Sequence, residues 1–316
     1  MIINKKFLCW TVFFVFVAPG LRAAPFAYVP NEKSGTVSVI DTATDSVVGE
    51  IKAGDKPRGL AASVDGKKLY VSDQPNNALV IIDLEKREAI GKIALGESPE
   101  GVNISKDGRW IVAAVEESNS VAFINAKTSK RAFTVKTKGK NPEHAVFSPD
   151  GKWVYVSAEE AEQVDVIDVK KRKQVAAINV GKRPRGIGFT PDGKLAYVAC
   201  EIASTVYAID VKSKTVVATI VAGNFSNGVT IAPDGKRVFI SNGKDGTVSV
   251  IDVASNQITS TIPVGKRPWN MAITPDGKKL YVANGRSNSA SVIDAESLNL
   301  LKEIPVGEIP WGVVIK

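Results

Sequence analysis

The stretch DGKKLYVANGRSNSASVID, residues 276–294, contains three short signatures that recur along the chain. Its Asp-Gly pair also begins at positions 65, 107, 150, 192 and 234, and its Ile-Asp pair at 40, 82, 167, 209 and 251. Its Tyr-Val pair recurs at 28, 70, 155 and 197. All three signatures keep a spacing of 42 or 43 residues, or twice that. The chain therefore consists of copies of one unit from about residue 26 onward.

Turn chemistry gives the order of strands inside each unit. In the copy around residue 190, a short strand (186–189) enters the turn Thr190-Pro191-Asp192-Gly193, where Pro fixes φ and Gly tolerates a positive φ. Strands are then expected at 195–199, 206–210 and 216–221. Units of about 40–45 residues with four short strands are typical of β-propeller blades. No convincing helix is expected after residue 23.

The two ends of the repeat region complement each other. The segment 27–30 has the character of a second strand, and 312–316 that of a first strand. Together they complete one shared blade, which closes the ring and removes exposed sheet edges. We therefore predict an all-β fold: a single seven-bladed β-propeller with four-stranded blades, spanning residues 24–316 and closed by the C-terminal strand.

The N-terminus has the features of a secretory signal peptide, residues 1–23. Lys5 and Lys6 precede an apolar run (7–18), and cleavage is expected after Ala23. The run is shorter than the roughly 20 residues that cross a bilayer. Cleavage would leave Cys200 as the one cysteine and 38 basic against 33 acidic residues, a net charge of +5. We expect a periplasmic or secreted monomer without a membrane span or disulfide.

Candidate binding residues lie where the loops converge on the central channel. The position that enters each innermost strand varies in charge and bulk, whereas its neighbours stay constant. A position whose residue type varies from unit to unit, on an otherwise regular scaffold, indicates a binding site for a ligand or partner. This position, the channel-mouth ring, is occupied by Arg58, Glu100, Glu143, Arg185, Asn227, Trp269 and Trp311.

A second set of loops should reach the same face, carrying Glu32, Gln74, Glu116, Glu159, Glu201, Gly243 and Gly285. The face should therefore have an acidic sector and a basic, aromatic one. Arg185, Lys266, Arg267 and the tryptophans belong to the basic sector. Arginine beside an aromatic plane can hold a flat anion or an acidic partner protein.

Other chemistry finds little support in the sequence. His144 is the single histidine, so a metal cage of several histidines is excluded and no metal site is predicted. A calcium ion held by carboxylates alone stays open but lacks a recognisable loop. The repeated Asp after each Ile should cap its own turn rather than catalyse. On the opposite face, the lysines between 127 and 214, with Arg172, suggest a solvated surface or a site for phosphate groups or a membrane surface.

The motifs resemble those of the YVTN-repeat propellers, most clearly in residues 276–294. The segments 27–33, 99–101, 105–110 and 310–314 are similar to those of propellers associated with PQQ-dependent alcohol catabolism. That resemblance implies export, a binding or docking role beside a quinoprotein dehydrogenase, and PQQ as a ligand rather than an intrinsic cofactor. It defines no catalytic activity.

Two alternatives remain. The chain also resembles propeller lactonases, in which Glu143 or His144 would act as base and Arg185 or Arg58 as oxyanion partner. A weaker alternative is binding of single-stranded nucleic acid by Phe225, Trp269 and Trp311. Cys200 replaces the Asn or Asp of other repeats and is expected to be a packing substitution.

Overall fold

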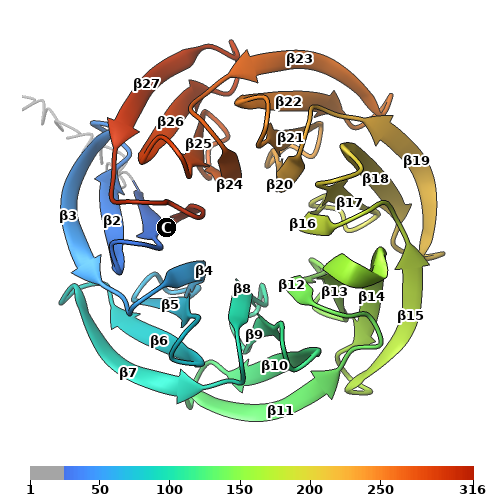
Figure 1. Ribbon diagram of the computed structural model, residues 1–316, viewed down its shortest axis with the longest axis horizontal. Helices are drawn as coiled ribbons and strands as arrows, with labels where there is room; N and C mark the ends of the chain where they lie inside the picture. Colours follow the sequence, from blue (N-terminus) through green and yellow to red (C-terminus); the bar gives the residue numbers. More distant parts are fainter. Residues whose placement is uncertain (1–24) are drawn as a thin grey trace, which may run out of the picture.

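The computed structural model describes residues 25–316, so the predicted signal peptide and its cleavage site lie outside the described residues. Within this range the chain forms seven four-stranded antiparallel sheets arranged around a central axis (Figure 1). The predicted all-β, seven-bladed propeller is confirmed. A single turn of 3-10 helix, η1 (Glu159–Ala161), interrupts the strands, and no helix between residues 25 and 316 has the length and apolar character to cross a membrane.

Each blade runs from an innermost strand at the channel to an outermost strand at the rim, and its strands are named in that order. Blade 1 is formed by β28 (Val314–Ile315), β1 (Phe26–Asn31), β2 (Thr36–Asp41) and β3 (Ser46–Lys52). Blade 2 is formed by β4 (Pro57–Ala62), β5 (Lys68–Asp73), β6 (Ala78–Asp83) and β7 (Glu88–Ala94). Blade 3 is formed by β8 (Pro99–Ile104), β9 (Trp110–Val115), β10 (Ser120–Asn125) and β11 (Lys130–Lys136). Blade 4 is formed by β12 (Pro142–Phe147), β13 (Trp153–Ala158), β14 (Gln163–Asp168) and β15 (Lys173–Asn179).

The remaining blades follow the same order. Blade 5 is formed by β16 (Pro184–Phe189), β17 (Leu195–Cys200), β18 (Thr205–Asp210) and β19 (Thr215–Val221). Blade 6 is formed by β20 (Ser226–Ile231), β21 (Arg237–Asn242), β22 (Thr247–Asp252) and β23 (Gln257–Pro263). Blade 7 is formed by β24 (Pro268–Ile273), β25 (Lys279–Asn284), β26 (Ser289–Asp294) and β27 (Leu300–Pro305).

Burial follows from the position of each strand in its blade. The second strands, such as β17, are buried along almost their whole length because neighbouring blades cover both faces, which explains their continuous apolar sequences. The outermost strands, such as β19, alternate between exposed and partly buried residues. Tyr70, Tyr155, Tyr197 and Tyr281 of the Tyr-Val signature are among the largest fully buried side chains. The signature is thus a core element between blades.

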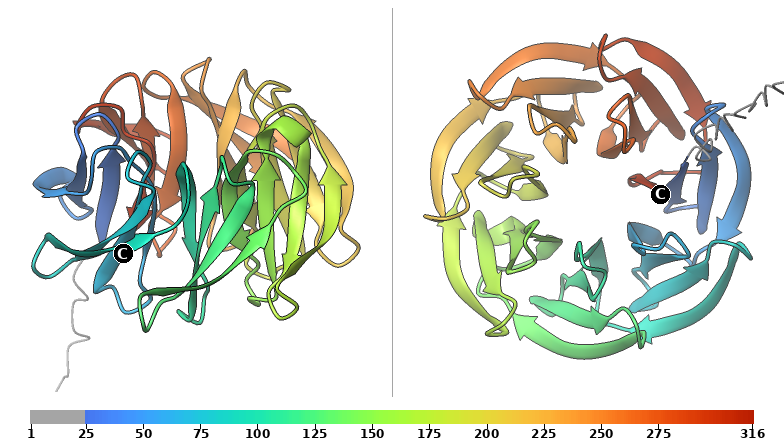
Figure 2. Two further views of the ribbon diagram at one scale, coloured as in Figure 1. Left: turned by 60° about the horizontal axis from the view of Figure 1, so that its bottom comes forward. Right: turned by 180° about the vertical axis from the view of Figure 1, so that it is seen from behind.

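The C-terminal strand closes the ring as predicted, although it is shorter than the expected 312–316. β28 pairs with β1 through Ala27–Ile315 and Tyr28–Val314, and an isolated bridge joins Asn31 to Pro310. In the other six blades a β-bulge follows the first residue of the innermost strand. The corresponding irregularity in blade 1 separates the Pro310 bridge from β28. The right-hand view of Figure 2 shows the C-terminus inside the ring, beside the N-terminal strand.

The repeated aspartates serve their own turns, as predicted. Asp294 accepts hydrogen bonds from the backbone N–H groups of Glu296 and Ser297, at 3.1 and 2.7 Å. The Asp of each Asp-Gly turn does the same, as Asp192 does for Lys194 at 3.1 Å. These carboxylates fix turns on the face opposite to the predicted site.

Candidate functional site

The channel-mouth ring is positioned by the β-bulges of the innermost strands. In β4, for example, Pro57 pairs with Asp73 and Leu60 with Val71, which leaves Arg58 and Gly59 in the bulge. Bulges commonly redirect a side chain near a functional site. Six ring residues lie at this same bulge position, and Trp311 lies between the Pro310 bridge and β28. The structure therefore brings the predicted ring together on one face.

Arg185 lies at the centre of a buried ion-pair cluster. Its Nη1 contacts the carboxylates of Glu143 and Glu159, and its Nε donates to Glu201 Oε2 at 3.0 Å. The Arg185 side chain is only 15% exposed. Glu201 also pairs with Arg267. Arg185 thus joins blades 4 and 5 and offers little free charge to an anionic ligand.

Arg58 forms a second ion-pair cluster across blades 1, 2 and 3. Its Nη1 is 2.6 Å from Glu100 Oε1, and its Nε is 3.2 Å from Glu32 Oε2. Gln74 Nε2 donates to the same oxygen of Glu100 at 2.8 Å. The other oxygen, Glu100 Oε2, is buried without a hydrogen-bond partner among residues 25–316. Four predicted residues from both loop sets therefore meet here.

The carboxylates of this face have different proton affinities. Burial and the nearby charge of Glu143 raise the pKa of Glu100 to about 8. The same two causes raise the pKa of Glu159 to about 7. Burial alone would raise the pKa of Glu143 and Glu201 as well, but the Arg185 guanidinium holds both below their ordinary value. Ionised and protonated carboxylates therefore lie close together in the channel mouth at neutral pH.

His144 stacks on Trp311, with ring centroids 5.3 Å apart and an angle of 17° between the planes. Burial lowers the pKa of His144 to about 4, so the imidazole is neutral at pH 7. Its Nδ1 atom is buried and has no hydrogen-bond partner within the described range. Glu143 is engaged by Arg185 instead. The histidine thus lacks the oriented carboxylate that usually accompanies a strong general base.

A basic hollow of about 490 Å³ lies beside the ring, between blades 6 and 7. Its side chains include Phe225, Lys244, Lys266, Arg267 and Arg286. The Arg267 guanidinium lies 5.2 Å from the centroid of Phe225 and 5.9 Å from that of Trp269. The predicted basic and aromatic sector is thus concave.

Gly243 lines this hollow, and Gly285 makes room for Trp269 beside it. Gly243 and Gly285 occupy the loop position at which the other blades carry glutamate or glutamine. A Cβ on Gly285 would overlap the Trp269 indole, and one on Gly243 would lie 3.0 Å from Arg267 Nη1. Their small size therefore seats both side chains. Among residues 25–316, Asp245 is the one carboxylate that lines the hollow, and it accepts hydrogen bonds from Asn224, so the surrounding cations leave the sector basic. Lys244 and Arg286 were not predicted; their position directly after these glycines is the signal that identifies them.

Cys200, the single cysteine among the described residues, is fully buried. It packs in the apolar cluster between blades 4 and 5 with Val164 and Ile187. Burial raises the pKa of its thiol to about 12. Both observations agree with the predicted packing role. Among residues 25–316, no cluster of three or more His, Cys, Asp or Glu side chains is arranged to hold a metal ion.

The protein is a seven-bladed β-propeller whose channel-mouth ring carries residues that differ in charge and size between blades. Residues 15–136 and 172–304 match the model of the family described as "Lactonase, 7-bladed beta-propeller". The chain belongs to this family. Residues 112–224 also match the cytochrome D1 heme domain. A search of curated proteins gave no significant match.

Solved structures share this architecture. A hydrazine synthase structure from Kuenenia stuttgartiensis matches with a TM-score of 0.79 and 22% identity, covering 91% of this chain and 99% of that one. A putative 6-phosphogluconolactonase from Bacteroides uniformis gives 0.78 and 21%, covering 93% and 100%. The dihydro-heme d1 dehydrogenase NirN, in complex with DHE, gives 0.70 and 16%, covering 95% and 77%. At these identities the likeness shows the fold alone.

Proposed function

We propose that this propeller is an exported binding protein that holds a flat anionic ligand, or an acidic partner protein, at the channel-mouth face. The basic hollow is the observation that carries this proposal. Lys244, Lys266 and Arg286 form no ion pair within residues 25–316, so their charge is available to a ligand. Phe225 supplies aromatic surface within the hollow, with Lys244 and Arg267 near its ring. The volume falls within the range of small-molecule sites.

PQQ is the ligand that we propose to test first. It is flat and anionic, and it matches a hollow that combines aromatic walls with free cations. The similarity of the repeat motifs to propellers of PQQ-dependent alcohol catabolism supports the same choice. In this proposal the chain acts in the periplasm or outside the cell, as a monomer, and assists a quinoprotein dehydrogenase.

A thermal-shift titration tests ligand binding directly. A ligand at 100 times its Kd stabilises the folded state by about 2.7 kcal/mol, which corresponds to about 5 °C in Tm for a chain of this size. We expect PQQ to raise the Tm of the wild-type protein but not of a Lys266→Ala/Arg286→Ala variant. Lys194→Ala, on the opposite face, is the matched control and should keep the shift. Equal shifts in all three proteins would refute the hollow as the site.

Lactone hydrolysis is the second candidate, favoured by the family to which the chain belongs. Glu143, His144, Arg185 and Arg58 all lie at the channel mouth, as this hypothesis requires. His144 would take a proton from water, and Arg185 would stabilise the developing oxyanion. However, a histidine with a pKa near 4 is a weak base, and Arg185 is already bound by three carboxylates. Hydrolysis of simple lactones that disappears in His144→Ala and Glu143→Gln would establish an enzymatic function.

If no small anion or lactone changes the Tm, the acidic protein partner becomes the remaining form of the proposal. Co-purification with the exported dehydrogenase then tests it, with Lys266→Glu as the variant that should lose the complex. A single-stranded oligonucleotide belongs in the same panel, because steep loss of binding with salt would identify nucleic acid as the ligand.

N-terminal sequencing of the exported protein tests cleavage after Ala23.

A further inference from the structure

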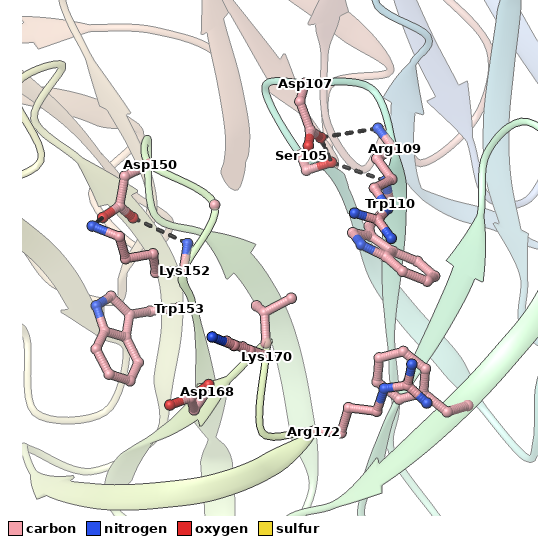
Figure 3. A pocket seen from close by; sticks show the side chains of 13 residues that line it. Ser105, Asp107, Arg109, Trp110, Asp150, Lys152, Trp153, Asp168, Lys170 and Arg172 are labelled. Atoms are coloured by element: carbon pink, nitrogen blue, oxygen red, sulfur yellow. Dashed lines mark hydrogen bonds and ion pairs between the residues drawn. The ribbon is translucent and has the colours of Figure 1, made fainter.

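The face opposite to the channel mouth contains a second cleft, between blades 3 and 4, of about 540 Å³. Trp110 at the start of β9, Phe133 of β11 and Trp153 at the start of β13 contribute its aromatic surface (Figure 3). Lys170, from the turn between β14 and β15, projects into the space between the two tryptophans, whereas Arg172, from the same turn, lies over the Phe133 ring. None of these residues belongs to the site described above.

The aromatic residues break the repeat, which provides an internal comparison. The position of Trp110 and Trp153 is occupied in the other blades by Phe26, Lys68, Leu195, Arg237 and Lys279. The position of Phe133 is occupied in the other blades by Gly49, Gly91, Ala176, Ala218, Ser260 and Lys302. The scaffold therefore does not require large aromatic side chains at these positions. Their concentration in two adjacent blades indicates a local role.

A second hollow of about 510 Å³ extends the cleft toward blade 5. The two hollows share Asp150, Lys152 and Trp153, so Trp153 forms a ridge between them. Beyond this ridge the surface adds Lys212 and Lys214. The result is one elongated groove across three blades, which we call the turn-face groove.

Cations lie over the aromatic rings along this groove. Arg172 is 4.6 Å from the centroid of Phe133, and Lys214 Nζ is 4.2 Å from that of Trp153. Arg109 lies 5.3 Å from the ring centroid of Trp110. These contacts hold the charges in place and occupy one face of each ring. A ligand therefore meets preorganised cations at the edges of aromatic groups.

The acidic residues of the groove are already engaged. Asp107, Asp150 and Asp168 each accept a backbone N–H of their own turn, and Asp150 also pairs with Lys152 at 2.9 Å. Several cations of the groove, in contrast, form no ion pair with any residue from 25 to 316: Arg109, Lys170, Arg172, Lys212 and Lys214. The groove thus carries an excess of free positive charge.

We propose that the turn-face groove is a second docking surface, which binds an extended acidic segment of a partner protein. Its length across three blades suits an extended chain rather than a compact small molecule. Its tryptophan and arginine residues are the types that dominate protein interfaces. Carboxylates of the segment would pair with the free cations, and apolar side chains would pack on the exposed aromatic edges. Base or sugar stacking is less favoured because cations cover one face of Phe133, Trp110 and Trp153.

Fluorescence anisotropy tests this proposal with a short labelled peptide that alternates glutamate with tyrosine. We expect saturable binding whose Kd rises about tenfold or more in a Lys170→Glu/Arg172→Glu variant. Lys236→Glu, on the same face of blade 6, is the control and should leave the Kd within about twofold of the wild type. Melting curves confirm that each variant is folded.

Several results would overturn the proposal. Absence of saturable binding would do so, as would an equal loss in Lys236→Glu, which would show that net charge alone attracts the peptide. Tighter binding of a sulfated glycan, a single-stranded oligonucleotide or phosphatidylserine vesicles would assign the groove to another class of ligand. Lys266→Glu is measured in parallel, because the basic hollow is also proposed to take acidic ligands. Loss of peptide binding in Lys266→Glu but not in Lys170→Glu/Arg172→Glu would place the peptide in the basic hollow and overturn this proposal, so the two proposals stay distinguishable.

Discussion

Replacing Arg185 by methionine should destabilise the propeller strongly at neutral pH. The guanidinium contacts three carboxylates of blades 4 and 5, and two of them, Glu143 and Glu201, are almost fully buried. Methionine keeps much of the side-chain volume but removes the ion-pair partner of Glu143, whereas Glu201 keeps Arg267. Removing one member of a buried ion-pair cluster costs about 3–5 kcal/mol. For a chain of this length the loss corresponds to a fall in Tm of about 6–10 °C.

The pH dependence of this loss distinguishes charge from packing. In the wild type, Arg185 lowers the pKa of Glu143 and Glu201, so their contribution to stability is present above the unfolded pKa of about 4.5 and disappears as the pH falls through the lower folded values. In Arg185→Met, the burial of Glu143 is no longer offset by its largest compensating charge, so its pKa should rise, whereas Arg267 and Arg183 still lower the pKa of Glu201. The penalty of the variant therefore applies at neutral pH and shrinks as the pH falls toward 5.

Differential scanning fluorimetry at pH 5.0, 6.0, 7.0 and 8.0 measures both effects. Lys194→Met is the control, because Lys194 is 80% exposed and pairs with a surface aspartate; its Tm should follow the wild type at every pH. The charge argument is refuted if Arg185→Met and the wild type have the same Tm at pH 8.0. It is refuted equally if the deficit is the same at every pH, since lost packing alone would then explain it.

Four further predictions concern other parts of the molecule. Gly285→Glu should displace the Trp269 indole at a cost of about 1–3 kcal/mol, seen as a lower Tm and changed tryptophan emission; unchanged spectra would contradict the close contact. Deleting residues 310–316 removes β28 and should abolish cooperative melting; a monomer with the wild-type Tm would disprove this form of ring closure. The protonated form of Glu100 contributes stability that is lost as the pH rises from its unfolded pKa of 4.5 toward its folded pKa of about 8. The Tm of Glu100→Gln should therefore fall less than that of the wild type between pH 5 and 9, and parallel Tm–pH curves for the two proteins would exclude the raised pKa. Cys200 should react with Ellman's reagent at pH 8 only after unfolding, and rapid labelling of the folded protein would refute its burial.

The sequence was sufficient to predict the fold because the relevant signals are local and repeated. The turn Thr190–Gly193 and the strand that follows it specify a hairpin without reference to the rest of the chain. The closing strand could be inferred because 27–30 and 312–316 are complementary parts of the same unit. Its reduction to two paired residues could not, since it depends on where the bulge falls against β1.

The candidate site was predictable in position but not in its pairing. The ring position could be found from the repeat, since it varies where its neighbours do not. The sequence places Arg185 in a basic sector that would meet a ligand, whereas its side chain lies among Glu143, Glu159 and Glu201. Two of these partners come from the preceding blade, so the contact depends on the distance and rotation between blades. Sequence periodicity does not report these quantities.

The contrast between Arg185 and Lys266 explains how one face can be both rigid and open. Where the loop position carries glutamate, as in blades 4 and 5, arginine is drawn into buried pairs that join the blades. Where the loop position carries glycine, as in blades 6 and 7, Lys244, Lys266 and Arg286 lack such partners and a concave basic surface remains. The same repeat position therefore determines whether a blade contributes to stability or to binding.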